Sequence, residues 1–131
     1  MRPVHELCAH LEHLVDKHGV AYAAFFTADG AMLAEAGSRS ALVHEGLVSA
    51  LLGPQGSASK TYASLEGQVL PQSYAQGGDT AIVDRAAPGV GAAYFIRAGN
   101  MPAKSPVEGY WWSKALAAEG RAPFERPGTA D

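Results

Sequence analysis

The chain has 131 residues, with 10 Lys and Arg against 13 Asp and Glu, a formal net charge of -3 and 47% hydrophobic residues. This composition is typical of one globular domain and excludes a mainly disordered chain. The slight acidity argues against binding to nucleic-acid backbones or anionic lipid. Cys8 is the single cysteine, which excludes a disulfide framework within the chain. No apolar run approaches a membrane span, and the N-terminus does not resemble a signal peptide, so we expect a cytoplasmic protein without membrane insertion.

The N-terminal segment has apolar residues at helical spacing from Val4 to Val15, and the stop signal Gly19 follows. An amphipathic helix is predicted there, with Cys8 on its apolar stripe. Two apolar runs come next, at 20–27 and 31–36, and the Asp-Gly pair between them is typical of a β-hairpin. Because the first run is apolar on both faces, we expect that strand to be covered on both sides.

The middle of the chain predicts a second helix over 38–52, ended by Gly53-Pro54, and a loop up to Gly67. Three more strands are predicted at 68–76, 79–85 and 90–97, and their short connections favour an antiparallel meander. The last of these is apolar on both faces, whereas the first is polar at its start and contains Pro71. We therefore expect the first and fifth strands inside the sheet and the third at an edge.

The C-terminal part begins with a helix-capping pattern, Ser105-Pro106-Val107-Glu108, and predicts a third helix that ends at about Ala118, before Gly120. One face of this helix is expected to carry Val107, Trp111, Ala115 and Ala118, with Tyr110 and Trp112 beside it. We interpret the large aromatic residues as the ones that dock the helix on the sheet. Residues 1–120 are then one domain, and residues 121–131 form a flexible tail.

Strands that are apolar on both faces need cover on both sides, and three amphipathic helices are available. The predicted fold is therefore an α+β three-layer sandwich, with a five-stranded antiparallel sheet between one helix and two helices.

Two short motifs in the predicted loop resemble chemical signatures. Ser57 and Lys60 fit a Ser-x-x-Lys pattern, but the accompanying motifs of acyl-transferring enzymes are missing. The stretch from Gly53 to Thr61 lacks the glycine that a phosphate-binding loop needs before its lysine, because Ser59 stands there. Neither motif therefore predicts catalysis or nucleotide binding.

The predicted helices also carry polar residues that could bind a metal ion or transfer a proton. His10, His13 and Asp16 follow one another at three-residue steps, and a solvated polar face is favoured over a metal site because no fourth ligand is evident. His44 and Glu45 point about 100° apart and are interpreted as a surface pair. We expect no catalytic, cofactor-binding or metal site, and no enzyme.

The second predicted helix carries more apolar surface than one sheet face can use. Its wider stripe, Val43, Leu47 and Leu51, lies beside the small Gly46 and Ala50 and is assigned to the sheet. A narrower patch of Ala41, Val48 and Leu52 remains, with His44 between the two. A monomer leaves that patch uncovered, so the sequence predicts a two-fold homodimer.

The order helix, hairpin, helix, three strands, helix, together with the segment from Gly19 to Ala34 and its Asp29-Gly30 turn, resembles the roadblock/dynein light-chain family over residues 4 to 118. The resemblance implies a roadblock/profilin-like topology and an obligate homodimer built from the second helix and the third strand. It adds Val69 and Leu70 to the candidate dimer interface of Ala41, His44, Val48 and Leu52. It also implies a bacterial regulator of a small Ras-like GTPase, without catalytic residues or cofactors of its own.

Two hypotheses therefore remain: a noncatalytic dimeric regulator or scaffold that binds a small Ras-like GTPase or another cytoplasmic protein, and a small-ligand sensory domain. Polar groups converging on the concave side of the sheet would favour the sensor, and unsatisfied apolar surface favours protein association. Pro71 cannot donate a ladder hydrogen bond, so strand pairing across the dimer axis stays open.

Overall fold

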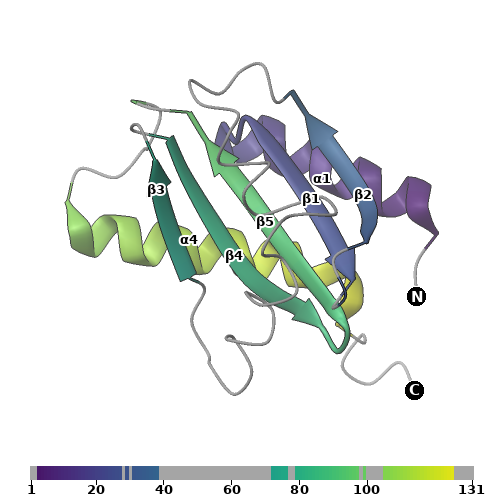
Figure 1. Ribbon diagram of the computed structural model, residues 1–131. Helices are drawn as coiled ribbons and strands as arrows, with labels where there is room; N and C mark the ends of the chain where they lie inside the picture. The colour runs from purple at the N-terminus through teal and green to yellow at the C-terminus, as the bar shows by residue number, and fades with distance from the viewer. Residues whose placement is uncertain are drawn as a thin grey trace.

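The computed structural model describes residues 3–27, 29, 31–38, 72–76, 79–97, 99 and 105–125 (Figure 1). The elements in chain order are α1 (Val4–His18), β1 (Tyr22–Thr27), β2 (Met32–Gly37), β3 (Gln72–Gln76), β4 (Asp79–Ala87), β5 (Val90–Ile96), α4 (Pro106–Arg121) and the 3-10 turn η2 (Ala122–Phe124). None of the helices in these ranges is long and apolar enough to cross a bilayer.

Helix α1 confirms the first predicted element at both ends. It stops at Gly19, whose φ of 68° is the left-handed conformation that glycine adopts without steric cost, and the Gly19 N–H donates to the Val15 carbonyl. Leu7, Leu11 and Leu14 form its buried stripe. Cys8, which was expected to be buried with them, is only half-buried.

Strands β1 and β2 form the predicted antiparallel hairpin, with a bulge between Phe25 and Phe26. The Thr27 N–H donates to the Ala31 carbonyl at 2.8 Å, and the Thr27 hydroxyl also bonds Asp29 in the turn. At the far end of the hairpin, Gly37 has a φ of 89°, and a Cβ there would overlap the Ala21 carbonyl oxygen. This close approach requires glycine.

The strands form one antiparallel sheet in the order β2-β1-β5-β4-β3. The predicted α+β class is confirmed, and the order agrees with the expected interior positions of β1 and β5 and the edge position of β3. Strand β4 continues to Ala87, two residues beyond the predicted end at 85, because Pro88 and Gly89 alone make the turn into β5. Gly89 permits this tight turn through its φ of 80°.

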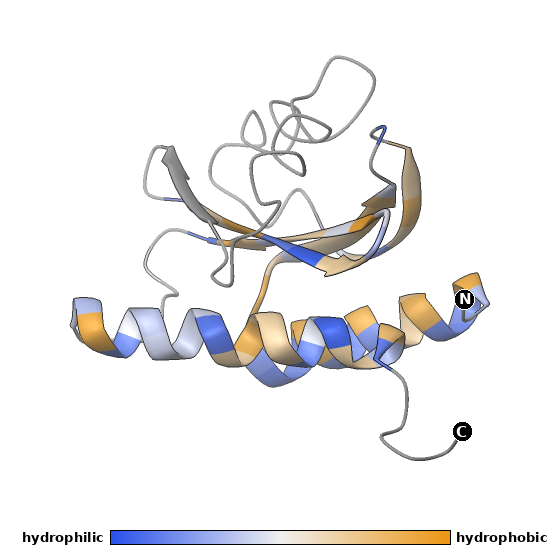
Figure 2. Cartoon of the chain, turned by 90° about the horizontal axis from the view of Figure 1, so that it is seen from below, coloured by the Kyte–Doolittle hydropathy of each residue, from blue (hydrophilic) through white to orange (hydrophobic). Residues whose placement is uncertain are grey.

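Helices α1 and α4 lie side by side on the same face of the sheet (Figure 2). The core between them and the sheet contains fully buried residues from five elements: Leu7, Leu11, Leu14, Phe25, Ile82, Tyr94 and Leu116. On the opposite face, Tyr22, Ala24, Phe26, Ala93 and Phe95 are also at most 1% exposed. Both faces of β1 and β5 are therefore buried, as the apolar pattern predicted.

Apart from Ser38, the predicted helix over 38–52 lies outside the described residues. The division of the helices between the two faces, and with it the three-layer sandwich, stays a prediction.

Helix α4 begins as predicted, since the Ser105 hydroxyl accepts the Glu108 N–H at 3.2 Å and Pro106 occupies the first turn. Its predicted inward face is wrong. Val107 and Trp111 are 66% and 59% exposed, and Ala115 and Ala118 are exposed as well. The buried residues are Ser113, Leu116, Ala117 and Gly120. Small side chains on this other face let the helix lie close to the sheet.

Gly120 explains why α4 continues past the predicted stop. It is buried, and a Cβ at this position would overlap the Tyr94 hydroxyl. The glycine therefore serves helix packing and does not end the helix, which runs to Arg121 and passes into η2. The Phe124 ring contacts Phe25 edge to face, with 5.0 Å between centroids, so the segment from Arg121 to Phe124 is part of the fold and was wrongly assigned to a tail.

The Tyr94 hydroxyl is buried and has no hydrogen-bond partner among the described residues, so we expect Tyr94→Phe to raise the free energy of unfolding by about 1 to 3 kcal/mol. Tyr22 is the matched control, because its hydroxyl donates to Glu35 Oε1 at 2.7 Å although the residue is equally buried. Tyr22→Phe should lower the free energy of unfolding by about 1 kcal/mol. Urea denaturation of both variants checks the pair, and a loss of stability in Tyr94→Phe contradicts the prediction.

Candidate functional site

The predicted dimer interface cannot be placed in the described part of the chain. Ala41, His44, Val48, Leu52, Val69 and Leu70 all lie outside the described residues. The segment with Ser57 and Lys60, together with Glu45, lies outside them too. Among the described residues, the candidate functional features are two polar contacts of α4 and one exposed face of the same helix.

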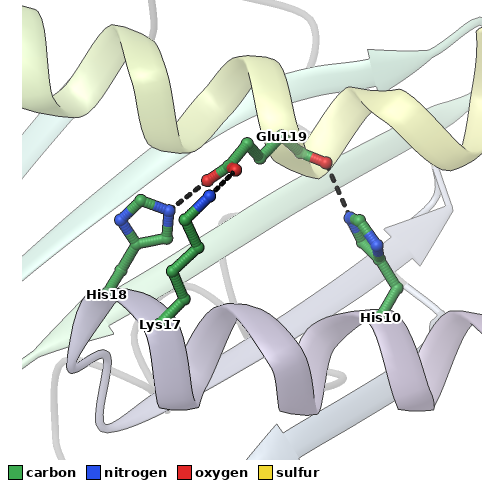
Figure 3. Close-up of polar contacts among 4 residues, drawn as sticks. All are labelled: His10, Lys17, His18 and Glu119. Carbon is green, nitrogen blue, oxygen red and sulfur yellow. Dashed lines mark hydrogen bonds and ion pairs between the residues drawn. The ribbon is translucent and has the colours of Figure 1, made fainter.

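Glu119 joins α4 to α1 through three side chains (Figure 3). Its carboxylate forms ion pairs with His18 and with Lys17, whose Nζ lies 2.5 Å from Oε1. Its main-chain oxygen lies 2.6 Å from Nε2 of His10, which precedes Lys17 and His18 by about two helical turns in α1. The hydrogen bond from Lys17, and then that from His18, holds the pKa of Glu119 below its usual range.

This contact corrects the prediction of a solvated polar face for His10, which is half-buried and bonded to α4. Within the described residues, no group of three or more His, Cys, Asp or Glu side chains is placed to hold a metal ion. An open cavity of about 280 Å³ lies beside His10 and is also lined by Glu6, Ala122 and Pro123. The described residues of its wall bring together one imidazole and one carboxylate and include no nucleophile.

Glu119→Gln should make the free energy of unfolding less sensitive to acidic pH. Since the pKa of Glu119 is lower in the folded state than its ordinary value of 4.5, the ionised form stabilises the fold above that value, and the contribution is lost as the pH falls below it. The carboxylate is 34% exposed, so the effect is at most about 1 kcal/mol. Urea denaturation at neutral and at acidic pH measures it, with Glu12→Gln on the exposed side of α1 as control. Equal acid sensitivity of Glu119→Gln and wild type would argue against the assignment.

A second contact fixes the end of α4 on the sheet. Nη1 of Arg121 donates to Oδ2 of Asp84 in β4 at 2.7 Å. The Asp84 side chain is 7% exposed, and its burial raises the pKa of this carboxyl despite the opposing charge of Arg121. Because the two side chains bind each other where α4 packs against β4, we assign this pair a structural role and not one in acid-base chemistry.

The exposed face of α4 is the feature that sequence reasoning placed on the wrong side. Tyr110 is 42% exposed and Trp111 59%, and their rings meet edge to face at 5.1 Å. The Lys114 ammonium lies 5.7 Å from the Tyr110 ring centre and 5.1 Å from that of Trp111. Trp112, by contrast, packs against the core and meets the His18 ring. The apolar spacing is visible in the sequence. The sequence does not show that Gly120 packs against Tyr94, and this contact places the other side of the helix inward.

No protein-family model and no curated protein matches the sequence, whereas solved structures match nearly all of the chain. MglB of Myxococcus xanthus is 12% identical, with a TM-score of 0.62 over 95% of this chain and 91% of that one. A structure of MglB with a tetrameric arrangement is 18% identical, with a TM-score of 0.54 over 93% of each chain. A roadblock/LC7 domain from Streptomyces avermitilis is 19% identical, with a TM-score of 0.56 over 89% of this chain and 95% of that one.

These matches show that the chain has the roadblock/LC7 fold. The resemblance seen in the sequence is thereby confirmed for the fold.

Proposed function

We propose that this protein is a noncatalytic, homodimeric regulator or scaffold of the cytoplasm, which binds a small Ras-like GTPase or another protein partner. The observation that carries the proposal is the match to MglB, which extends over 95% of the chain and so leaves little room for an added catalytic unit within it. The family resemblance of the sequence supplies the expected partner class, since its bacterial members pair with small Ras-like GTPases.

The sheet face away from α1 and α4 supports protein association over the alternative of a small-ligand sensor. Its described side chains on β1 and β5 are apolar apart from the Tyr22 hydroxyl, which is already bonded to Glu35. The Phe26 ring lies over Gly91, where a Cβ would overlap it. A ligand site needs a few convergent polar groups in a cavity. The described side chains of β1 and β5 offer only the Tyr22 hydroxyl on this face, and the strand register adds Asp79 and Arg85 of β4.

Self-association is supported by the spare apolar patch of the second predicted helix, Ala41, Val48 and Leu52. A protein of this fold, MglB, is known in a tetrameric arrangement. We propose the same helix, together with Val69 and Leu70, as the interface between two copies of this chain. In a dimer of this kind, each partner-binding surface occurs twice.

Calorimetric titration tests the partner class. Each purified small Ras-like GTPase of the source organism is titrated with this protein in its GDP and GTP forms, and GTP hydrolysis is followed in parallel. We expect saturable binding to one GTPase with a preference for one nucleotide state, and no saturable binding of GTP or ATP to this protein alone. Nucleotide binding by the isolated protein would contradict the proposal, and failure of every GTPase to bind would contradict the GTPase as its partner.

A further inference from the structure

The exposed face of α4 is an apolar stripe that contains Lys114 and has the exposed Glu108 at its edge. Its members are Val107, Tyr110, Trp111, Lys114, Ala115 and Ala118. The other sides of the helix are already used: Leu116 and Gly120 face the sheet, while Trp112 and Glu119 face α1. The stripe is therefore the flank of α4 that points away from both.

The first half of α4 buries little of its own surface. All four buried residues of the helix lie between Ser113 and Gly120, and none lies in its first two turns. Those turns extend past β3, the edge strand of the sheet (Figures 1 and 2). Three of the five large hydrophobic residues that are exposed in the described chain, Val107, Tyr110 and Trp111, nevertheless gather on these turns. Trp and Tyr are among the residue types that dominate protein interfaces.

The shape of the stripe fits a helix. From Val107 to Ala118 it measures about 16 Å along a straight axis, at roughly 1.5 Å per residue. Large side chains stand at its beginning, and Ala115 and Ala118 leave a flat surface at its end. A helix laid along it can bury the Trp111 ring and approach the main chain at the two alanines.

The charge of the stripe indicates which kind of partner can bind to it. Lys114 is the one charged residue of the stripe, so its complement is a carboxylate flanked by apolar side chains. A second copy docked antiparallel about the middle of the stripe would place the two Lys114 residues within about one helical turn of each other along the axis, which is unfavourable for two ammonium groups. A single lysine on a chain of net charge -3 is also too little for a nucleic acid or an anionic membrane.

We propose that this flank of α4 is a second docking surface, and that it binds an amphipathic helix of another protein that carries an acidic residue opposite Lys114. The rings of Tyr110 and Trp111 supply the apolar contact, and the ammonium over them sets the register. This surface lies on the helix-covered side of the sheet, and the proposal does not depend on the GTPase partner.

The test uses two synthetic probes on the full-length protein: labelled 18-residue helical peptides with the same leucine stripe, one flanked by glutamates and the other by lysines. Fluorescence anisotropy should show the acidic peptide binding about tenfold or more tightly than the basic one. Trp111→Ala should weaken the binding of the acidic peptide by about tenfold or more, since aromatic anchor residues contribute most of the binding energy in such a contact. Lys114→Glu should reverse the preference between the peptides. Val4→Ala, at an exposed apolar residue of α1, should change the affinity for neither peptide.

Circular dichroism of each variant establishes that the fold is kept, as expected for side chains on the surface. Equal affinity for the two peptides, or unchanged binding in Trp111→Ala, would overturn the proposal. A drop in the oligomeric mass of Trp111→Ala would also overturn it, because the stripe would then join two copies of this chain. Loss of this surface leaves the GTPase titration unchanged, so the two proposals fail separately.

Discussion

The double substitution Val48→Asp with Leu52→Asp is expected to convert the dimer into a folded monomer. Both residues lie outside the described structure and belong to the narrower apolar patch of the second predicted helix. Each buried Val or Leu contributes about 1.5 to 3 kcal/mol by leaving water. Because a two-fold interface contains each residue twice, roughly 6 to 12 kcal/mol is at stake before the costs of association are subtracted. Sedimentation velocity measures the mass, and circular dichroism should stay near that of wild type.

Leu47→Asp is the matched variant on the wider stripe of the same helix, which we assign to the sheet. A buried, unpaired carboxylate should unfold the domain instead of separating two folded subunits. If the double variant remains a dimer, or if Leu47→Asp yields a folded monomer, the two faces of the helix have been assigned the wrong way round.

Phe25→Ala should have the largest effect on the stability of a single subunit. The ring is fully buried in the core between β1 and the two helices and contacts Phe124 at 5.0 Å. Removal of such a ring costs about 3 to 5 kcal/mol, because a cavity remains in addition to the lost transfer free energy. Urea denaturation measures the loss.

Phe124→Ala provides a test of the C-terminal turn. This ring is half-buried, so its loss should cost less than that of Phe25, and the two substitutions should not be additive since the rings contact each other. Val4→Ala, at 56% exposure, should stay within about 0.5 kcal/mol of wild type. Full stability of Phe124→Ala would show that η2 contributes nothing to the core.

Local signals in the sequence sufficed for the elements whose ends are set by special residues. Gly19 ends α1, the Asp29 turn joins β1 to β2, and Ser105 caps α4, each through an interaction with residues a few positions away. The apolar pattern of β1 and β5 predicted burial on both faces, since a strand alternates its side chains with a period of two. These parts of the fold required no knowledge of distant residues.

The orientation of α4 could not be predicted in that way. Its larger apolar side chains, Val107 and Trp111, indicated an inward face by hydrophobicity alone. What decides the matter is a contact between residues 26 positions apart, the Tyr94 hydroxyl against Gly120, which only a glycine permits. The same holds for the link from Glu119 to His18, more than 100 residues away in the chain. Sequence spacing therefore identified an apolar stripe and misplaced it, and that stripe is now the proposed docking surface.

The mass of the wild-type protein in solution tests the central claim most directly, because a dimeric regulator requires two copies of the chain before any partner is bound. Size-exclusion chromatography coupled to light scattering, at low micromolar concentration, should give twice the mass of one chain. A mass of one chain would contradict the account.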